Sequence, residues 1–85
     1  MTYTLKNGFE LSLDNSALDN WELLEVLAEI DGGKSTLITK AFPMLVGKEQ
    51  FEKLKEHMRT NGKISIAQMV DTFSEIMNYL ENGKK

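Results

Sequence analysis

The segment from Leu18 to Asp31 constrains the fold most strongly, because its apolar residues recur at helical spacing. Asp19 and Glu22 have the spacing of a capping box, in which each side chain bonds to a free amide of the first turn. Leu18 and Leu23 have the spacing of a hydrophobic staple around that cap. Two glycines follow, and one of them can end the helix in a left-handed conformation. We therefore predict a helix over about 19–31 whose buried stripe consists of Leu23, Leu24, Leu27 and Ile30.

Before this segment, apolar side chains alternate with polar ones, which is typical of a half-buried hairpin. Asn7-Gly8 marks its turn. A two-residue loop would place Leu5 opposite Glu10 and mix apolar with charged side chains on each face. A three-residue loop places Leu5 opposite Phe9 and keeps one face apolar. We predict a hairpin over 2–13 with Gly8 left-handed in a bulge.

Two helices are expected in the middle of the chain, over about 36–46 and 48–60. Ser35 has the position and chemistry of an N-cap for the first of them. Pro43 lacks an amide hydrogen and is expected to kink or interrupt that helix, because proline also disfavours the helical conformation at the preceding Phe42. The second helix has a narrow apolar stripe of Phe51, Leu54 and Met58.

A fourth helix is expected over about 65–81, followed by a frayed tail over 82–85. Ser65 and Gln68 form a second capping box, and Ile64 with Met69 a second staple. The fold class predicted is α+β, an N-terminal hairpin followed by a bundle of about four helices in a single domain over 1–85. The expected apolar stripe of the last helix consists of Ile66, Met69, Val70, Phe73, Ile76, Met77 and Leu80.

Composition narrows the classes of function. The chain has 85 residues and a formal net charge of -3, which argues against nucleic acid as a partner. It has no cysteine, and no apolar run reaches the roughly 20 residues that span a bilayer. The N-terminus lacks the pattern of a signal peptide. We therefore expect a cytoplasmic protein, with no membrane contact and with self-association as one way to stabilise so small a core.

Three features that resemble functional motifs are better explained structurally. Residues 33–36 read GKST, like the end of a phosphate-binding loop, but Ala28 stands where that loop needs its first glycine and a helix precedes it. His57 has no second histidine or cysteine with which to share a metal. Glu25 and Glu29 form a like-charged pair on a wet helix face. We therefore expect no catalytic, cofactor-binding or metal site, and no enzyme.

The segment 37–46 carries more apolar residues than one face of a surface helix needs. One interpretation buries them all in the small core. The other leaves Phe42, Met44 or Val46 partly exposed as a docking patch for a partner. Trp21, one residue off the main stripe of its helix, is open to the same two interpretations.

Several stretches of the chain form a recognisable order: DNWELLE at 19–25, LVGKEQFEKLKEH at 45–57, Gly62 and SEIM at 74–77. In this order they resemble the tail assembly chaperones of long-tailed phages and prophages of Gram-positive bacteria. The pattern differs at Lys48, where that family usually has an acidic residue, and at Phe51, where it usually has tyrosine.

This resemblance implies a non-enzymatic protein that coats the long, apolar, helical tape-measure protein and keeps it soluble while tail-tube subunits polymerise. It also implies the host cytoplasm as the location, absence from the finished virion, and a longer frameshifted form that contacts the tube protein. Two alternatives stay open: another small phage morphogenesis protein, such as a head–tail joining component, and a host adaptor that docks to one protein.

Overall fold

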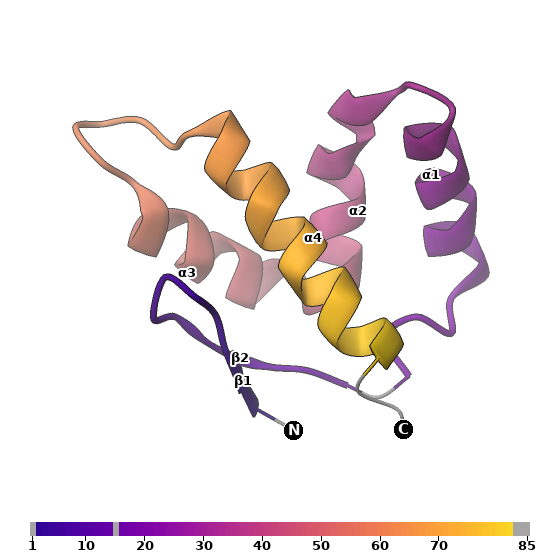
Figure 1. The fold of residues 1–85 in the computed structure, drawn as a ribbon, viewed down its shortest axis with the longest axis horizontal. Helices are drawn as coiled ribbons and strands as arrows, with labels where there is room; N and C mark the ends of the chain where they lie inside the picture. The colour runs from indigo at the N-terminus through magenta and orange to yellow at the C-terminus, as the bar shows by residue number, and fades with distance from the viewer. Residues whose placement is uncertain (1, 15, 83–85) are drawn as a thin grey trace.

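A short hairpin followed by four helices makes up the computed structural model of the chain, as Figure 1 shows. The structure describes residues 2–14 and 16–82; the predicted tail over 83–85 lies outside them, and Asn82 belongs to the last helix. The predicted α+β class is confirmed. The elements are β1 (Thr2–Thr4), β2 (Glu10–Ser12), α1 (Trp21–Asp31), the 3-10 turn η1 (Ser35–Leu37), α2 (Ile38–Val46), α3 (Lys48–Met58) and α4 (Ile66–Asn82).

The hairpin adopts the predicted register. β1 and β2 pair antiparallel with Tyr3 opposite Leu11. The amide of Leu5 donates to the carbonyl of Phe9 at 2.8 Å, and the amide of Gly8 donates to the carbonyl of Leu5 at 2.9 Å. Gly8 has a φ of 91°, a conformation that costs glycine little. The three-residue loop with a left-handed glycine is therefore confirmed, and the apolar face of the hairpin enters the core.

Polar contacts to α3 and α4 hold the hairpin against the helices, including two hydrogen bonds between Gln50 and the backbone of Ser12. The Tyr3 hydroxyl donates to Glu75 Oε2 on α4 at 2.8 Å, and the amide of Lys6 donates to the same oxygen at 3.1 Å. At the hairpin tip, the Nε2 atom of His57 lies 3.0 Å from the carbonyl oxygen of Asn7. His57 is exposed, as expected, and its ring joins the end of α3 to the loop between the strands.

The start of α1 differs from the prediction by one position. The side-chain oxygen of Asn20 accepts hydrogen bonds from the amides of Glu22, at 3.0 Å, and Leu23, at 3.3 Å. The predicted cap at Asp19 is therefore wrong, because asparagine satisfies free first-turn amides as well as aspartate does. The shift also removes the spacing that a capping box at Glu22 and a staple between Leu18 and Leu23 require.

The end of α1 is the predicted glycine stop. The amide of Gly33 donates to the carbonyl of Ile30, and the amide of Lys34 donates to that of Glu29, both at 3.0 Å. Gly33 has a φ of 110°. Together these bonds form a Schellman motif, which satisfies carbonyls at the end of the helix. The glycine and lysine of the GKST sequence thus terminate a helix, whereas the predicted cap at Ser35 is wrong because Ser35 begins η1.

α2 is continuous through its proline. The helix spans Ile38–Val46, with Pro43 inside it and Phe42 helical. The predicted interruption is therefore wrong. Proline removes one hydrogen bond and disfavours the helical conformation of the residue before it. However, α2 packs against α1, α3 and α4, and four of its side chains are buried. Tertiary packing outweighs the local preference.

The core forms around Phe42, whose ring centroid lies 5.0 Å from that of Phe51 on α3 and 5.3 Å from that of Phe73 on α4. The inner face of α4 is rotated from the prediction, since Thr72 is buried and Ile66 is 82% exposed. Val70 is also exposed. Buried apolar side chains come from the hairpin and every α-helix: Leu5, Leu11, Leu13, Leu23, Val26, Ala41, Phe42, Leu45, Val46, Leu54, Met58, Phe73, Ile76 and Leu80.

Replacing the cap of α1 tests its position. We expect Asn20→Ala to lower the free energy of unfolding by about 1 kcal/mol, because two amides lose their acceptor. Asp19→Ala is the matched control. It should lower the free energy of unfolding by only about 0.3 kcal/mol, because it removes a negative charge near the positive end of the helix dipole. Urea unfolding followed by circular dichroism measures both, and an equal loss in the two variants would contradict this assignment.

The contact between Tyr3 and Glu75 makes part of the stability depend on pH. The hydrogen bond to Glu75, followed by partial burial, raises the pKa of the Tyr3 phenol above its ordinary value of 10.0. Because the pKa of Tyr3 is raised in the folded state, its contribution to stability is fully present below pH 10.0, the ordinary pKa. The contribution is lost as pH rises through the raised folded-state pKa. We therefore expect the stability difference between the wild type and Tyr3→Phe to be constant from about pH 7 to 9 and to decrease as pH rises through the raised pKa of Tyr3. Urea unfolding at each pH measures it, and a constant difference throughout would refute this role.

Candidate protein-docking surface

The structure separates the four residues predicted to bind a partner. Phe42 is 0% exposed and Val46 is 7% exposed, so the expectation that either forms part of a surface patch is wrong. Both are buried because α2 lies between the other helices and presents apolar residues on more than one side. Met44 is half-buried, and Trp21 is 71% exposed. Trp21 and Met44 therefore remain as candidates.

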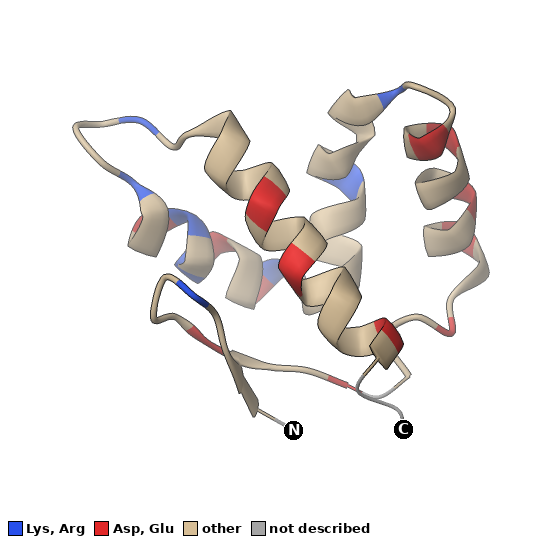
Figure 2. Cartoon of the chain, in the orientation of Figure 1, with Lys and Arg blue, Asp and Glu red and all other residues tan. Residues whose placement is uncertain are grey.

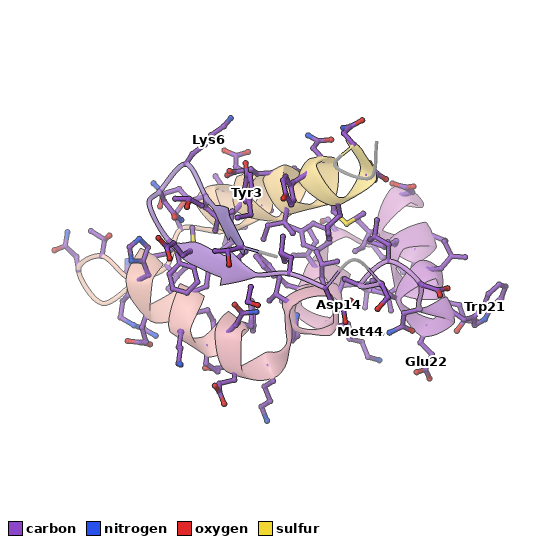
Figure 3. All side chains as sticks on the ribbon, turned by 90° about the horizontal axis from the view of Figure 1, so that it is seen from below. Tyr3, Lys6, Asp14, Trp21, Glu22 and Met44 are labelled. Carbon is purple, nitrogen blue, oxygen red and sulfur yellow. The ribbon has the colours of Figure 1, made fainter. Side chains whose placement is uncertain are left out.

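Trp21 and Met44 border the same hollow, although they belong to different helices. The hollow has a volume of about 550 Å³ and lies where the start of α1 meets the end of α2. In Figure 3, Trp21 points outward at one end of the molecule, and Asp14 and Met44 lie nearer its middle. The hydroxyl and the amide of Ser16 both bond to the carboxylate of Asp14, which lowers the pKa of that acid. The side of this hollow near β2 is therefore polar.

A second hollow, here called the α1–α2 groove, continues from Met44 along α1. Its volume is about 670 Å³. One wall carries three glutamates of α1, whereas the other carries Lys40 and Met44 of α2. Met44 borders both hollows, so the groove leads toward the side of Trp21. The residues that line the groove are Glu22, Glu25, Val26, Ala28, Glu29, Lys40 and Met44.

The groove is acidic because α1 contains no lysine or arginine (Figure 2). Among its acidic residues, Glu29 pairs with Lys34 at 3.5 Å. Within residues 2–14 and 16–82, no ion pair involves Glu22 or Glu25. Such exposed carboxylates attract cations of a partner over about a Debye length, roughly 10 Å at moderate salt.

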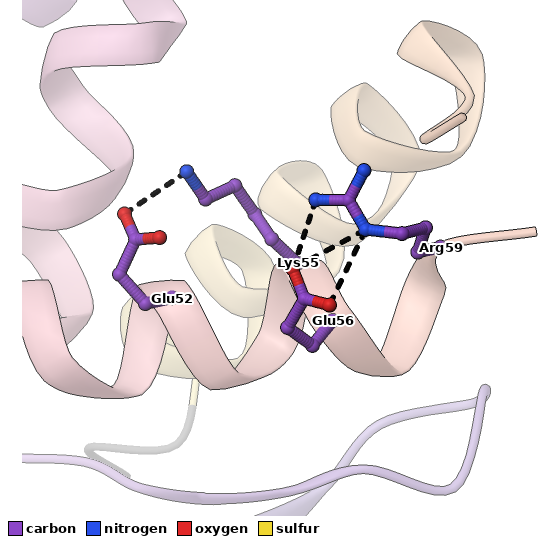
Figure 4. Close-up of polar contacts among 4 residues, drawn as sticks. All are labelled: Glu52, Lys55, Glu56 and Arg59. Carbon is purple, nitrogen blue, oxygen red and sulfur yellow. Dashed lines mark hydrogen bonds and ion pairs between the residues drawn. The ribbon is translucent and has the colours of Figure 1, made fainter. Parts of the chain in front are cut away.

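Two of the three lysines of α3, Lys53 and Lys55, contrast with this wall, because each is paired with a glutamate of the same helix. Lys55 lies 2.9 Å from Glu52, and Arg59 lies 2.8 Å from Glu56 (Figure 4). The hydrogen bonds from Arg59 lower the pKa of Glu56 and raise that of Arg59. Glu49 and Lys53 form a further ion pair, at 3.7 Å. α3 is therefore a nearly neutral surface despite its lysines.

Leu24 belongs to the exposed surface, although its apolar character predicted burial. It is 53% exposed, one turn after Trp21 on the outer face of α1. The buried residues of α1 are Leu23 and Val26, whose side chains face α2 and η1. The sequence contains a signal for this, since Trp21 and Leu24 have helical spacing and lie together off the axis of the buried stripe.

A further hollow lies between the hairpin, the end of α3 and α4, with a volume of about 910 Å³. Its ionisable groups include Glu75 and His57, which hold the hairpin in place through Tyr3, Lys6 and Asn7. These side chains therefore have a structural function in the fold.

Comparisons with protein-family models, with curated proteins and with solved structures found no match for this chain. Over the described part of the chain, none of the helices combines the length and the apolar character needed to span a membrane.

The burial of Phe42 and the exposure of Trp21 predict opposite effects on stability. We expect Phe42→Ala to lower the free energy of unfolding by about 3 to 5 kcal/mol, because it leaves a cavity between three helices. Trp21→Ala should change it by no more than about 0.5 kcal/mol. If Phe42→Ala does not fold, Phe42→Leu should still fold with a loss of about 1 to 2 kcal/mol. Urea unfolding measures each variant, and a large loss in Trp21→Ala would show that this ring supports the core.

Proposed function

We propose that this chain is a tail assembly chaperone of a long-tailed phage or prophage, and that it binds the helical tape-measure protein and keeps it soluble. The observation that carries the proposal is the exposed Trp21, which borders a hollow between two helices and has the exposed Leu24 one turn later. The segment DNWELLE, part of the resemblance to that family, contains both residues. The proposal therefore joins a sequence resemblance to a surface suited to binding.

Exposed aromatic residues next to a hollow are typical of binding surfaces. Tryptophan is enriched among the residues that contribute most to protein interfaces, because one side chain buries a large apolar area on association. Methionine adapts its shape to varied partners, and Met44 lies in the wall of both hollows. A groove between two helices accommodates the apolar face of an amphipathic helix. A tape-measure protein, as a long helical chain with apolar faces, is a partner of this kind.

The acidic charge of α1 also suits a solubilising role. A protein that covers apolar segments of a long polymer prevents aggregation only if its own surface remains charged and hydrated. The net charge of -3 and the exposed carboxylates of α1 meet this requirement.

Sequencing the DNA around this reading frame is the first test. We expect a slippery frameshift site near the stop codon and, downstream, a very long reading frame with helical periodicity. Flanking genes for metabolism or regulation would remove the main support for the proposal.

Co-expression with that long protein is the direct test. We expect the wild type to shift the long protein from the insoluble to the soluble fraction, and Trp21→Ala to reduce that shift by about tenfold, because interface tryptophans typically contribute more than one factor of ten in affinity. Lys53→Ala, at an exposed position of α3, is the matched control and should behave as the wild type. If the chain has no effect on solubility, or is found in finished particles, it is not a chaperone of this class.

A further inference from the structure

We propose that the α1–α2 groove selects a basic amphipathic helix, one that carries lysine or arginine along one edge and an apolar anchor near one end. The inference names the chemistry of the segment that binds; that this segment belongs to a tape-measure protein rests on the proposed function. Three observations support this proposal: the spacing of three carboxylates on α1, the positions of Trp21 and Met44, and the pairing of basic residues of α3 with glutamates of this chain.

The three glutamates of the groove form a row along α1. Glu22, Glu25 and Glu29 are separated by three and four residues, so they lie above one another on the same side of the helix. The row is about 10 Å long at 1.5 Å per residue. Lys40 on the opposite wall is the one basic side chain that lines the groove among the residues the structure describes, so the groove keeps an excess of negative charge. A partner helix with cations at i, i+3 or i+4, and i+7 matches the row.

The apolar end of the surface fixes the position of the anchor. Trp21 precedes the glutamate row, and Met44 lies between the groove and the hollow beside Trp21. A large apolar side chain at one end of the partner helix can cover both residues while its basic edge lies along the glutamates. The surface therefore specifies both the charge of the segment and the end at which its anchor lies.

A second copy of this chain is a poorer occupant. The described helix richest in basic residues is α3, in which Lys53 and Lys55 are each paired with a glutamate, as is Arg59 directly after its end. An α3 from another copy would bring those glutamates to the acidic wall together with its lysines. A segment whose basic residues are not paired with its own carboxylates avoids this repulsion between like charges.

Two designed peptides of about 20 residues test the groove directly, at a length that forms a helix readily. They share one leucine stripe with a terminal phenylalanine anchor, and differ only in having lysine or glutamate along one edge. Because Trp21 is the chain's only tryptophan, its fluorescence reports docking without a label. At low ionic strength we expect the lysine peptide to shift Trp21 emission to shorter wavelength and to bind at least about tenfold more tightly than the glutamate peptide.

Reversing the charge of the wall should reverse the preference. Glu22→Lys with Glu25→Lys should favour the glutamate peptide, by roughly tenfold. Asp71→Lys with Glu81→Lys is the matched control, because it makes the same change in net charge at two exposed positions of α4 and should keep the wild-type preference. Raising the salt concentration should reduce the preference in every case.

The inference is overturned if the two peptides bind equally, if the control reverses the preference as well, or if Trp21 emission shifts with protein concentration alone, which would make a second copy the occupant. The result is separable from that of the co-expression test. Loss of the solubilising effect with the peptide preference intact would remove the proposed function and leave the groove chemistry. A solubilising effect that survives Glu22→Lys with Glu25→Lys would remove only this inference.

Discussion

The packing of Phe42 is the contact on which the rest of the structure depends. Its ring lies fully buried between Phe51 of α3 and Phe73 of α4, and it belongs to the helix that also supports α1. Aromatic rings at such distances add to the free energy already gained by burying their area. Because all four α-helices meet through α2, a proline in that helix is tolerated: the packing on its several sides outweighs one lost backbone hydrogen bond.

This arrangement leaves α1 supported from one side. α1 has 11 residues, too short to be stable as an isolated helix, and it packs on α2 and η1. Asn20 at its start and Gly33 after its end therefore stabilise an element that the core covers only partly. The exposed outer face and the groove beside α2 follow from the same geometry. The docking surface is thus a consequence of how the small core is built.

Much of the fold follows from local patterns in the sequence. The hairpin register follows from the alternation of apolar residues and the position of Gly8, since a different loop length would mix the faces. The errors arise where two residues compete for one role or where tertiary packing decides. Asp19 and Asn20 are both good caps, and only the path of the preceding turn selects Asn20. On α4, burial of Thr72 in place of Val70 depends on where α3 lies, which no local pattern encodes.

The docking surface shows a different limit of sequence reasoning. Apolar density left burial and exposure both open for Phe42 and Val46 of α2, and both are buried because a segment rich in apolar residues is what a central helix of a small core requires. Large apolar residues are exposed instead on α1, where Trp21 and Leu24 depart from an otherwise regular stripe, and on α4, at Ile66 and Val70. An apolar residue outside the stripe exposes apolar area to water and adds no buried area to the core. Its position is therefore not explained by the stability of the isolated fold. Together with a row of glutamates that the chain itself largely leaves unpaired, Trp21 is the basis for the partner proposed above, a segment with an apolar anchor followed by positive charge.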